Sequence, residues 1–106
     1  MSSIYTILNS NFANAGHPCE PKAISQAYKL LKFHRGPDDR IEIDHSSVKS
    51  LHPIKNPANP DQIFDVLEVW GYIYKGQYRM RFIYEVGIKA KSCLLMGQEI
   101  LEFVSL

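Results

Sequence analysis

Residues 64–106 decide the fold of this chain: FDVLEVWGYIYKGQYRMRFIYEVGIKAKSCLLMGQEILEFVSL. This stretch is rich in β-branched and aromatic residues, which fit a pleated surface, and it predicts three long antiparallel strands. Lys75-Gly76-Gln77 places a glycine where a hairpin needs a positive φ. Gly87 opens a second polar connection, which runs through Lys89 and Lys91.

The middle strand alternates with a period of two, which predicts one mainly apolar and one mainly polar face. The outer two strands are partly apolar on both faces, so we expect another element or a partner to cover the second face. Gly71 and Gly97 lie inside strands, where bulges that rotate a face by one residue are expected. The sequence therefore leaves open which face a helix covers. The two faces of the middle strand would carry Tyr78, Met80, Phe82, Tyr84 and Val86 on one side, and Arg79, Arg81, Ile83 and Glu85 on the other.

The N-terminal part predicts one clear helix over 21–34, with Pro21 in its first turn and Gly36-Pro37 after its end. Its apolar stripe would consist of Ile24, Ala27, Tyr28, Leu30 and Leu31.

The remaining N-terminal segments give weaker patterns. Residues 3–13 fit a short helix better than an edge strand, and residues 40–44 alternate like a short strand. Residues 45–62 contain three prolines from Pro53 to Pro60, so we expect a long irregular loop there. Together the segments predict a single α+β domain over 1–106, with one or two N-terminal helices on one face of an antiparallel sheet of about four strands.

Composition bounds the possible partners. The chain has 106 residues, 45% of them hydrophobic and 22% charged, with a net charge of +1. This charge gives no electrostatic reason to expect nucleic acid or a membrane as a partner. The N-terminus does not resemble a secretory signal, and no apolar run approaches the length of a membrane helix. We therefore expect Cys19 and Cys93 to be free thiols in a cytoplasmic protein.

No residue pattern demands a particular chemistry. The four histidines have no metal-ligand spacing: His45 and His52 lie in the long loop beside scattered aspartates. Cys19 with His17 could form a thiol nucleophile with its base, but a histidine two residues away is rarely oriented correctly. Phosphate-binding loops and nucleophile elbows are also missing. We expect a protein that is not an enzyme and that uses no cofactor and no metal.

The first hairpin is the strongest local feature, because it concentrates aromatic residues and arginines. These residue types are enriched at protein–protein hot spots and also stack on unpaired bases. Trp70, Tyr72, Tyr78 and Tyr84 could instead build the core under the helix. Arginine is seldom buried without a partner, so the arginine face should meet solvent, an acidic partner or phosphate. The candidate partner-binding residues are Trp70, Tyr74, Lys75, Arg79, Arg81 and Glu85 on the hairpin, with His45 and His52 in the long loop.

The segment GYIYKGQYRMRFIYEVGIKAKSCLLMGQEILEF resembles the C-terminal hairpin of RelE/HigB-type toxins, which are ribosome-dependent mRNA endonucleases. The resemblance implies that Arg79 and Arg81 clamp phosphate and that Tyr84 donates a proton. The chain departs from this pattern because it lacks a strongly basic balance and has Gln98-Glu99 where a His or Arg would be expected.

In size, composition and lack of a catalytic set, the chain is similar to small immunity proteins of interbacterial toxin systems, such as contact-dependent growth inhibition. This resemblance implies a cytoplasmic, non-catalytic protein that neutralises a cognate protein toxin by direct binding. It is the leading hypothesis from the sequence. The alternatives are the RelE/HigB-type endonuclease and a homodimeric accessory protein, in which the second sheet face would form a symmetric interface.

Overall fold

The computed structural model describes residues 16–86 and 92–104. The predicted helix over 3–13 and the second connection, from Gly87 to Lys91, lie outside these residues. The described part is an α+β domain, as predicted from the sequence, with one helix against an antiparallel sheet of five strands. Its elements are α2 (Glu20–Arg35), β1 (Ile41–Ser50), β2 (Ile54–Asn56), β3 (Asn59–Ile73), β4 (Gly76–Val86) and β5 (Cys93–Val104).

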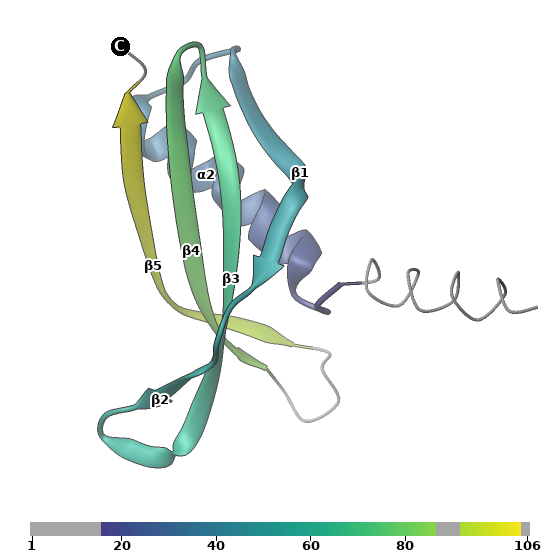
Figure 1. Cartoon of the computed structure of the whole chain (residues 1–106), viewed down its shortest axis with the longest axis vertical. Helices are drawn as coiled ribbons and strands as arrows, with labels where there is room; N and C mark the ends of the chain where they lie inside the picture. Colours follow the sequence, from purple (N-terminus) through teal and green to yellow (C-terminus); the bar gives the residue numbers. More distant parts are fainter. Residues whose placement is uncertain (1–15, 87–91, 105–106) are drawn as a thin grey trace, which may run out of the picture.

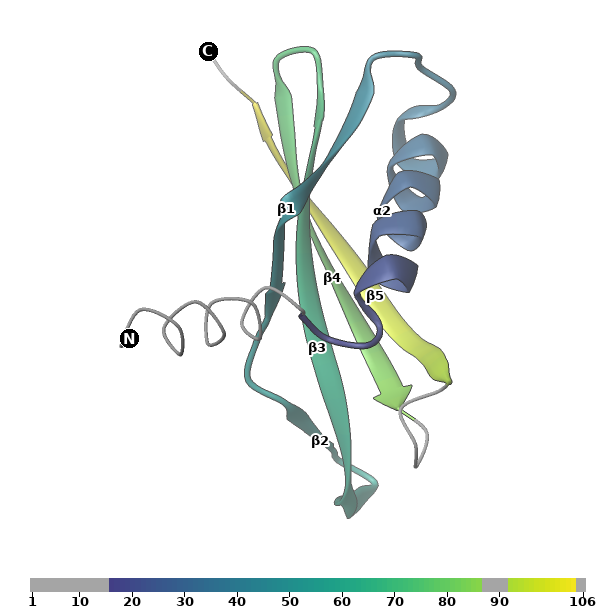
Figure 2. The ribbon, with the colours of Figure 1, turned by 90° about the vertical axis from the view of Figure 1, so that its right-hand side faces the viewer.

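The sheet has the strand order β1-β3-β4-β5, and the short β2 pairs with the first part of β3. Figure 1 shows these strands side by side, with α2 behind them. After a quarter turn, Figure 2 shows α2 against one side of the sheet only. The three C-terminal strands predicted from residues 64–106 are therefore present, and β3 begins five residues earlier, at Asn59.

The β3–β4 hairpin turns at Tyr74-Lys75, one position earlier than the sequence suggested. The positive φ of the turn (52°) falls on Tyr74, and Gly76 has no positive φ, so the predicted reason for this glycine was wrong. Gly76 is needed for space: a Cβ there would lie 2.9 Å from the hydroxyl oxygen of Tyr78. Tyr74 adopts a left-handed backbone conformation, which residues other than glycine seldom do.

Helix α2 agrees with the predicted range to within one residue at each end. Pro21 lies in its first turn, and Gly36, at φ 86°, donates its N–H to the carbonyl of Lys32. The predicted apolar stripe was partly wrong, because Tyr28 is 44% exposed. The side chains that α2 buries are Ala23, Ala27, Leu30 and Leu31.

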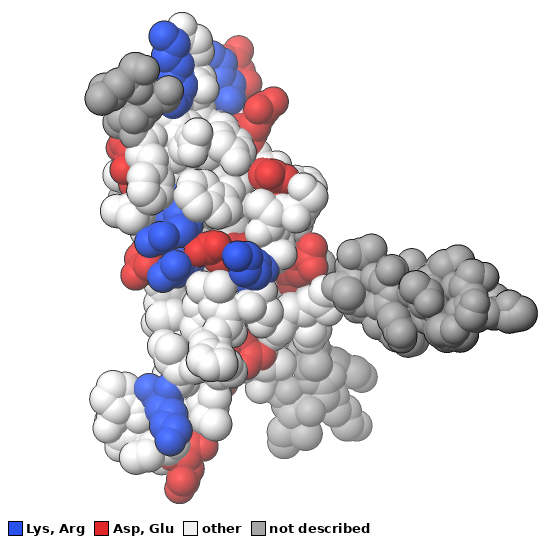
Figure 3. Space-filling view, viewed as in Figure 1, with Lys and Arg blue, Asp and Glu red and all other residues white. Residues whose placement is uncertain are grey.

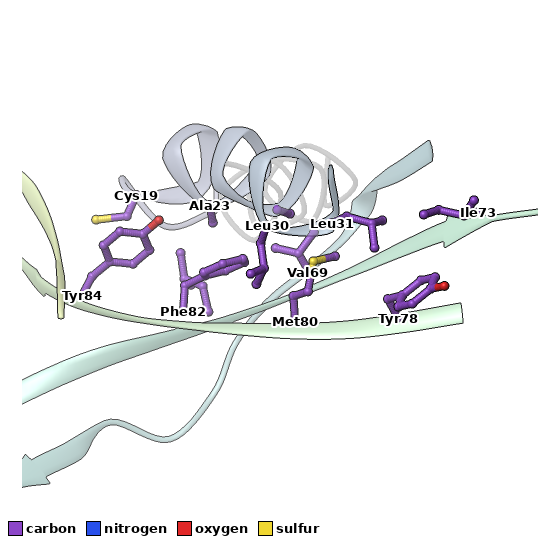
Figure 4. Close-up of a cluster of buried hydrophobic side chains, with 12 residues drawn as sticks. Cys19, Ala23, Leu30, Leu31, Val69, Ile73, Tyr78, Met80, Phe82 and Tyr84 are labelled. Atoms are coloured by element: carbon purple, nitrogen blue, oxygen red, sulfur yellow. The ribbon is translucent and has the colours of Figure 1, made fainter. Parts of the chain in front are cut away.

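The core lies between α2 and one face of the sheet, as Figure 4 shows. This face of β4 carries the apolar set predicted from the alternation, so the helix covers the apolar and not the arginine side. The two small alanines of α2 allow the helix to approach the large side chains of the strands. From the sheet, the core contains Leu67, Val69, Ile73, Tyr78, Met80, Phe82 and Tyr84.

The two strand glycines have different roles. β5 contains the predicted bulge at Gly97: Ile83 pairs with Gly97 and Tyr84 with Leu95, so β5 has one extra residue there. The β3–β4 register passes through Gly71 without a shift, so the bulge predicted there was wrong. A Cβ on Gly71 would lie 3.0 Å from side-chain atoms of both Leu31 and Met80. Gly71 therefore provides room for the helix.

Residues 45–62 are mostly extended, and the prediction of a long irregular loop was wrong. β1 continues to Ser50 across a register shift, where the Ser47 hydroxyl accepts a hydrogen bond from the N–H of Trp70 at 3.0 Å. The prolines do not prevent strands because they lie at strand ends and in the turn: Pro53 precedes β2, and Pro57 lies between β2 and β3.

Cys19 and Cys93 form a disulfide, so the expectation of free thiols was wrong, and Cys19 has no free thiol that could act as a nucleophile beside His17. The bond joins residues 74 positions apart in sequence and connects the start of α2 with the start of β5. His17 also fixes this end of the helix. Its Nδ1 accepts the N–H of Cys19 at 2.9 Å, and its Nε2 therefore carries a proton and donates it to Asp65 of β3 at 2.6 Å.

Among the described residues, no helix is both long enough and apolar enough to cross a membrane.

Candidate protein-binding surface

The sheet face that points away from α2 is the candidate binding surface, and we call it the open face. In residues 16–86 and 92–104, no helix or strand is layered on it (Figure 2). Strand register assigns its side chains, because residues paired across neighbouring strands point to the same side. The open face carries Glu42, Asp44 and Lys49 of β1, Phe64, Val66, Glu68, Trp70 and Tyr72 of β3, Gln77, Arg79, Arg81, Ile83 and Glu85 of β4, and Leu94, Glu99, Leu101 and Phe103 of β5.

A charged row crosses the middle of the open face. It consists of four residues that are paired in register: Lys49 of β1 with Glu68, Glu68 with Arg81, and Arg81 with Glu99. The Arg81 Nε–H donates to Glu68 at 3.1 Å, and the Arg81 Nη1 lies 3.8 Å from Glu99. Figure 3 shows this row as a band of alternating red and blue across the molecule, with mostly uncharged surface above and below it.

Within residues 16–86 and 92–104, Glu68 is the only charged residue that is buried, at 6% exposure. Burial of a carboxylate is costly unless cations and hydrogen bonds compensate for the lost water. Arg81 supplies one such hydrogen bond, and the Nε of Arg79 lies 3.8 Å from the same carboxylate. That Arg79 Nε is buried and has no hydrogen-bond partner. One donor of the cluster is therefore left unused, which is uncommon for a buried polar atom.

An aromatic patch lies on the open face between the charged row and the hairpin turn. The rings of Trp70 and Phe103 stack with their centroids 5.7 Å apart, and the Arg79 guanidinium lies 5.9 Å from the Phe103 centroid. Phe103 and its neighbour Leu101 remain 40% and 45% exposed. Large side chains that are packed on one side and exposed on the other are typical of a surface that another protein can cover.

A second apolar patch lies on the other side of the charged row. Phe64 and Val66 are buried there, at 8% and 7% exposure. Leu94 and Ile54 are exposed beside them. Near this patch the Gln62 side-chain amide donates a hydrogen bond to Glu85 at 3.1 Å. Glu85, one of the predicted site residues, therefore takes part in a contact between β3 and β4.

Two of the predicted site residues form a separate cluster at the end of the hairpin. Tyr74 is 71% exposed, and the Arg40 guanidinium and the Lys75 ammonium lie 5.3 and 5.5 Å from the centroid of its ring. Arg40 also makes a two-point ion pair with Asp38, at 3.0 and 2.9 Å. These residues line a polar hollow of about 230 Å³.

The Arg40 side chain, and after it the Arg40 backbone N–H, lower the pKa of Asp38 from 3.8 to about 2 by hydrogen bonding to its carboxylate. Because the folded pKa is the lower one, the pair adds stability above about pH 4, and this contribution is lost as the pH falls towards 2.

We expect a carboxyl NMR titration of the wild type to give Asp38 a pKa near 2. In the Arg40→Gln variant this pKa should rise towards 3.8, and an unchanged low value would contradict the assigned cause.

The eight predicted site residues thus do not form one surface. Trp70, Arg79, Arg81 and Glu85 lie on the open face, and Tyr74 and Lys75 lie at the hairpin end. His45 is exposed on the edge strand β1, and His52 is exposed between β1 and β2. Sequence reasoning missed Lys49, Glu68, Glu99, Leu101 and Phe103, because only the strand register reveals that they share the face of the arginines.

The residues implied by the RelE/HigB resemblance do not form one site. Tyr84 is 2% exposed on the helix side of β4, and burial raises the pKa of its hydroxyl. Arg79 and Arg81 point to the opposite face. Of the aromatic residues for which a core role was considered, Tyr78 and Tyr84 are in the core, whereas Trp70 and Tyr72 belong to the open face.

Among the described residues, no three His, Cys, Asp or Glu side chains lie close enough together to hold a metal ion. No protein-family model matches the chain, and comparison with the curated proteins and with the solved structures gave no match.

Proposed function

We propose that this chain is a non-catalytic binding protein that neutralises a cognate protein toxin, in the manner of an immunity protein, and that it binds through the open face. The observation that carries the proposal is the make-up of this face. A central row of charges lies between two apolar patches, and one patch contains a stacked Trp70–Phe103 pair. Protein interfaces commonly combine aromatic and arginine anchors with charges that fix orientation.

The same face is poorly suited to phosphate. Its charged row contains as many acidic as basic side chains, and the Glu68 carboxylate lies 3.8 Å from the Nε of Arg79 and 3.1 Å from that of Arg81. Nucleic-acid surfaces rely on an excess of Lys and Arg, which this row lacks. The charge pattern therefore favours a protein partner over RNA, and it supports the immunity-type function over the endonuclease.

The disulfide bears on where this function would take place. The sequence led us to expect a cytoplasmic protein, because its N-terminus does not resemble a secretory signal, and therefore two free thiols. Disulfides persist mainly in oxidising compartments and are rare in the cytosol. Because Cys19 and Cys93 are bonded, we propose that the protein meets its toxin in an oxidising compartment.

A growth assay tests the proposed function. Cells that express this chain alone, in an oxidising compartment and in the cytosol, should grow normally with intact total RNA. A protein that co-purifies with the chain should arrest growth when it is expressed alone, and co-expression of the chain should restore growth. Growth arrest and RNA cleavage by the chain itself would contradict the proposal and favour the endonuclease.

A further inference from the structure

The charged row has a symmetry that the individual ion pairs do not show. Across the strand order β1-β3-β4-β5 its members are Lys49, Glu68, Arg81 and Glu99, so the sign alternates from one strand to the next. With four members, the row begins with a positive and ends with a negative charge. When it is read backwards, every charge is replaced by its opposite. A row of this kind is complementary to a copy of itself.

We infer that the open face binds a second copy of this chain, in a two-fold symmetric dimer whose sheets pack face to face. If the two-fold axis runs parallel to the strands, between β3 and β4, the row of one copy meets the reversed row of the other. Glu68 then faces Arg81 of the second copy, and Lys49 faces Glu99. The two-fold repeats each contact, as in isologous dimers, where one patch meets itself.

An axis along the strands places each apolar patch against its own copy, and it places Glu42 and Asp44 of β1, at the edge of the sheet, opposite Phe103 and Leu101 of the second copy. Val66 and Ile83 are paired in register on β3 and β4, so each would face the other residue in the second copy. Trp70 and Arg79 are paired in the same way. The Arg79 guanidinium, whose Nε has no hydrogen-bond partner, would lie over the indole of the second copy. Packed sheets keep their strands within about 30° of each other. At this angle the register pairs of β3 and β4, which lie next to the axis, still face each other in the two copies.

The face is also large enough for a stable dimer. Strands lie about 4.8 Å apart and rise about 3.3 Å per residue. Four strands along the length of β4 therefore offer about 600 Å² in each copy, from the spacings alone. A dimer would bury about 1,200 Å² in total, which is at the lower end of specific interfaces.

This inference goes beyond the proposed function, because it concerns the chain in the absence of toxin. A toxin that binds the open face would have to displace the second copy. The dimer can be measured on the purified, disulfide-bonded chain alone, whereas toxin neutralisation is measured in cells. Failure of one is therefore distinguishable from failure of the other.

The test uses charge reversal at the two ends of the row. Lys49 and Glu99 are both exposed, so Lys49→Glu and Glu99→Lys should leave the fold intact. We expect sedimentation equilibrium to show a monomer–dimer equilibrium for the wild type. Each single variant should dimerise at least tenfold more weakly, since it places like charges opposite each other. An equimolar mixture of the two variants should regain wild-type affinity to within about threefold. In the mixed dimer the two introduced side chains, of opposite charge, face each other, and the unchanged Lys49 of one copy faces the unchanged Glu99 of the other.

Recovery in the mixture separates contacts between copies from effects within one chain. β1 and β5 lie at opposite edges of the sheet, so mixing leaves the surroundings of each variant side chain within its own chain unchanged. Lys29→Glu, on the exposed surface of α2, is the control, since it makes the same change in net charge as Lys49→Glu and should dimerise like the wild type. A wild type that stays monomeric at several hundred micromolar, or a mixture as weak as the single variants, would overturn the inference.

Discussion

Replacement of both cysteines, in the variant Cys19→Ser/Cys93→Ser, is expected to lower the free energy of unfolding by about 4 kcal/mol. The disulfide closes a loop between residues 74 positions apart, and a cross-link of this length removes much of the conformational entropy of the unfolded chain. It also fixes the start of α2, which has no side-chain hydrogen bond as its N-cap, to β5. Urea unfolding, followed by the circular dichroism of the sheet and helix, measures the effect.

A reducing agent provides the matched control. It should destabilise the wild type by a similar amount and leave the double variant unchanged. Mass shifts after alkylation of freshly isolated protein should show both thiols protected. If reduction changes wild-type stability by less than about 1 kcal/mol, the disulfide is not a main support of the fold.

Gly71→Val should cause the second large loss, of about 3 kcal/mol. The Cβ alone would lie 3.0 Å from side-chain atoms of Leu31 and Met80 and 3.1 Å from Ile43, and valine adds two further methyl groups. The space between α2 and the sheet is filled, so the helix or these side chains must move.

Gly97→Val is the control for the change in residue type. Its Cβ would meet only Ile83, at 3.5 Å, which is an ordinary contact. We expect a change of about 1 kcal/mol or less in urea unfolding. If the two valine variants were equally stable, Gly71 would not be the position that sets the approach of the helix.

The sequence predicted the fold class and the three C-terminal strands because their information is local. Alternation in β4 and the residue types of β3 to β5 identify strands without knowledge of the neighbours. The end of α2 was equally visible, since Gly36-Pro37 cannot continue a helix. These predictions did not require knowledge of which residues meet in space.

Predictions that depended on tertiary contacts were less successful. The prolines of 45–62 suggested a loop, but they lie at strand ends and in the turn, where a missing N–H has no cost to the sheet. The disulfide could not be foreseen, because Cys19 and Cys93 are brought together only when α2 packs on the sheet.

The candidate site was predictable only in part, for the same reason. Arg79 and Arg81 were recognised from their own strand. The buried partner Glu68 and the far ends of the row, Lys49 and Glu99, depend on register across four strands. The Gly97 bulge changes the face on which the residues of β5 lie, so Leu101 and Phe103 could not be assigned from β5 alone.

The protection assay with two matched variants tests most directly whether the open face is the binding surface. Leu101→Asp places a carboxylate within the aromatic patch, at a residue that is 45% exposed, and Phe33→Asp makes a similar change on α2, at 88% exposure. If the open face binds the toxin, Leu101→Asp abolishes protection of growth and Phe33→Asp retains it, at equal amounts of folded protein. Full protection by Leu101→Asp, with loss of protection in Phe33→Asp, would contradict this account and assign binding to the helix.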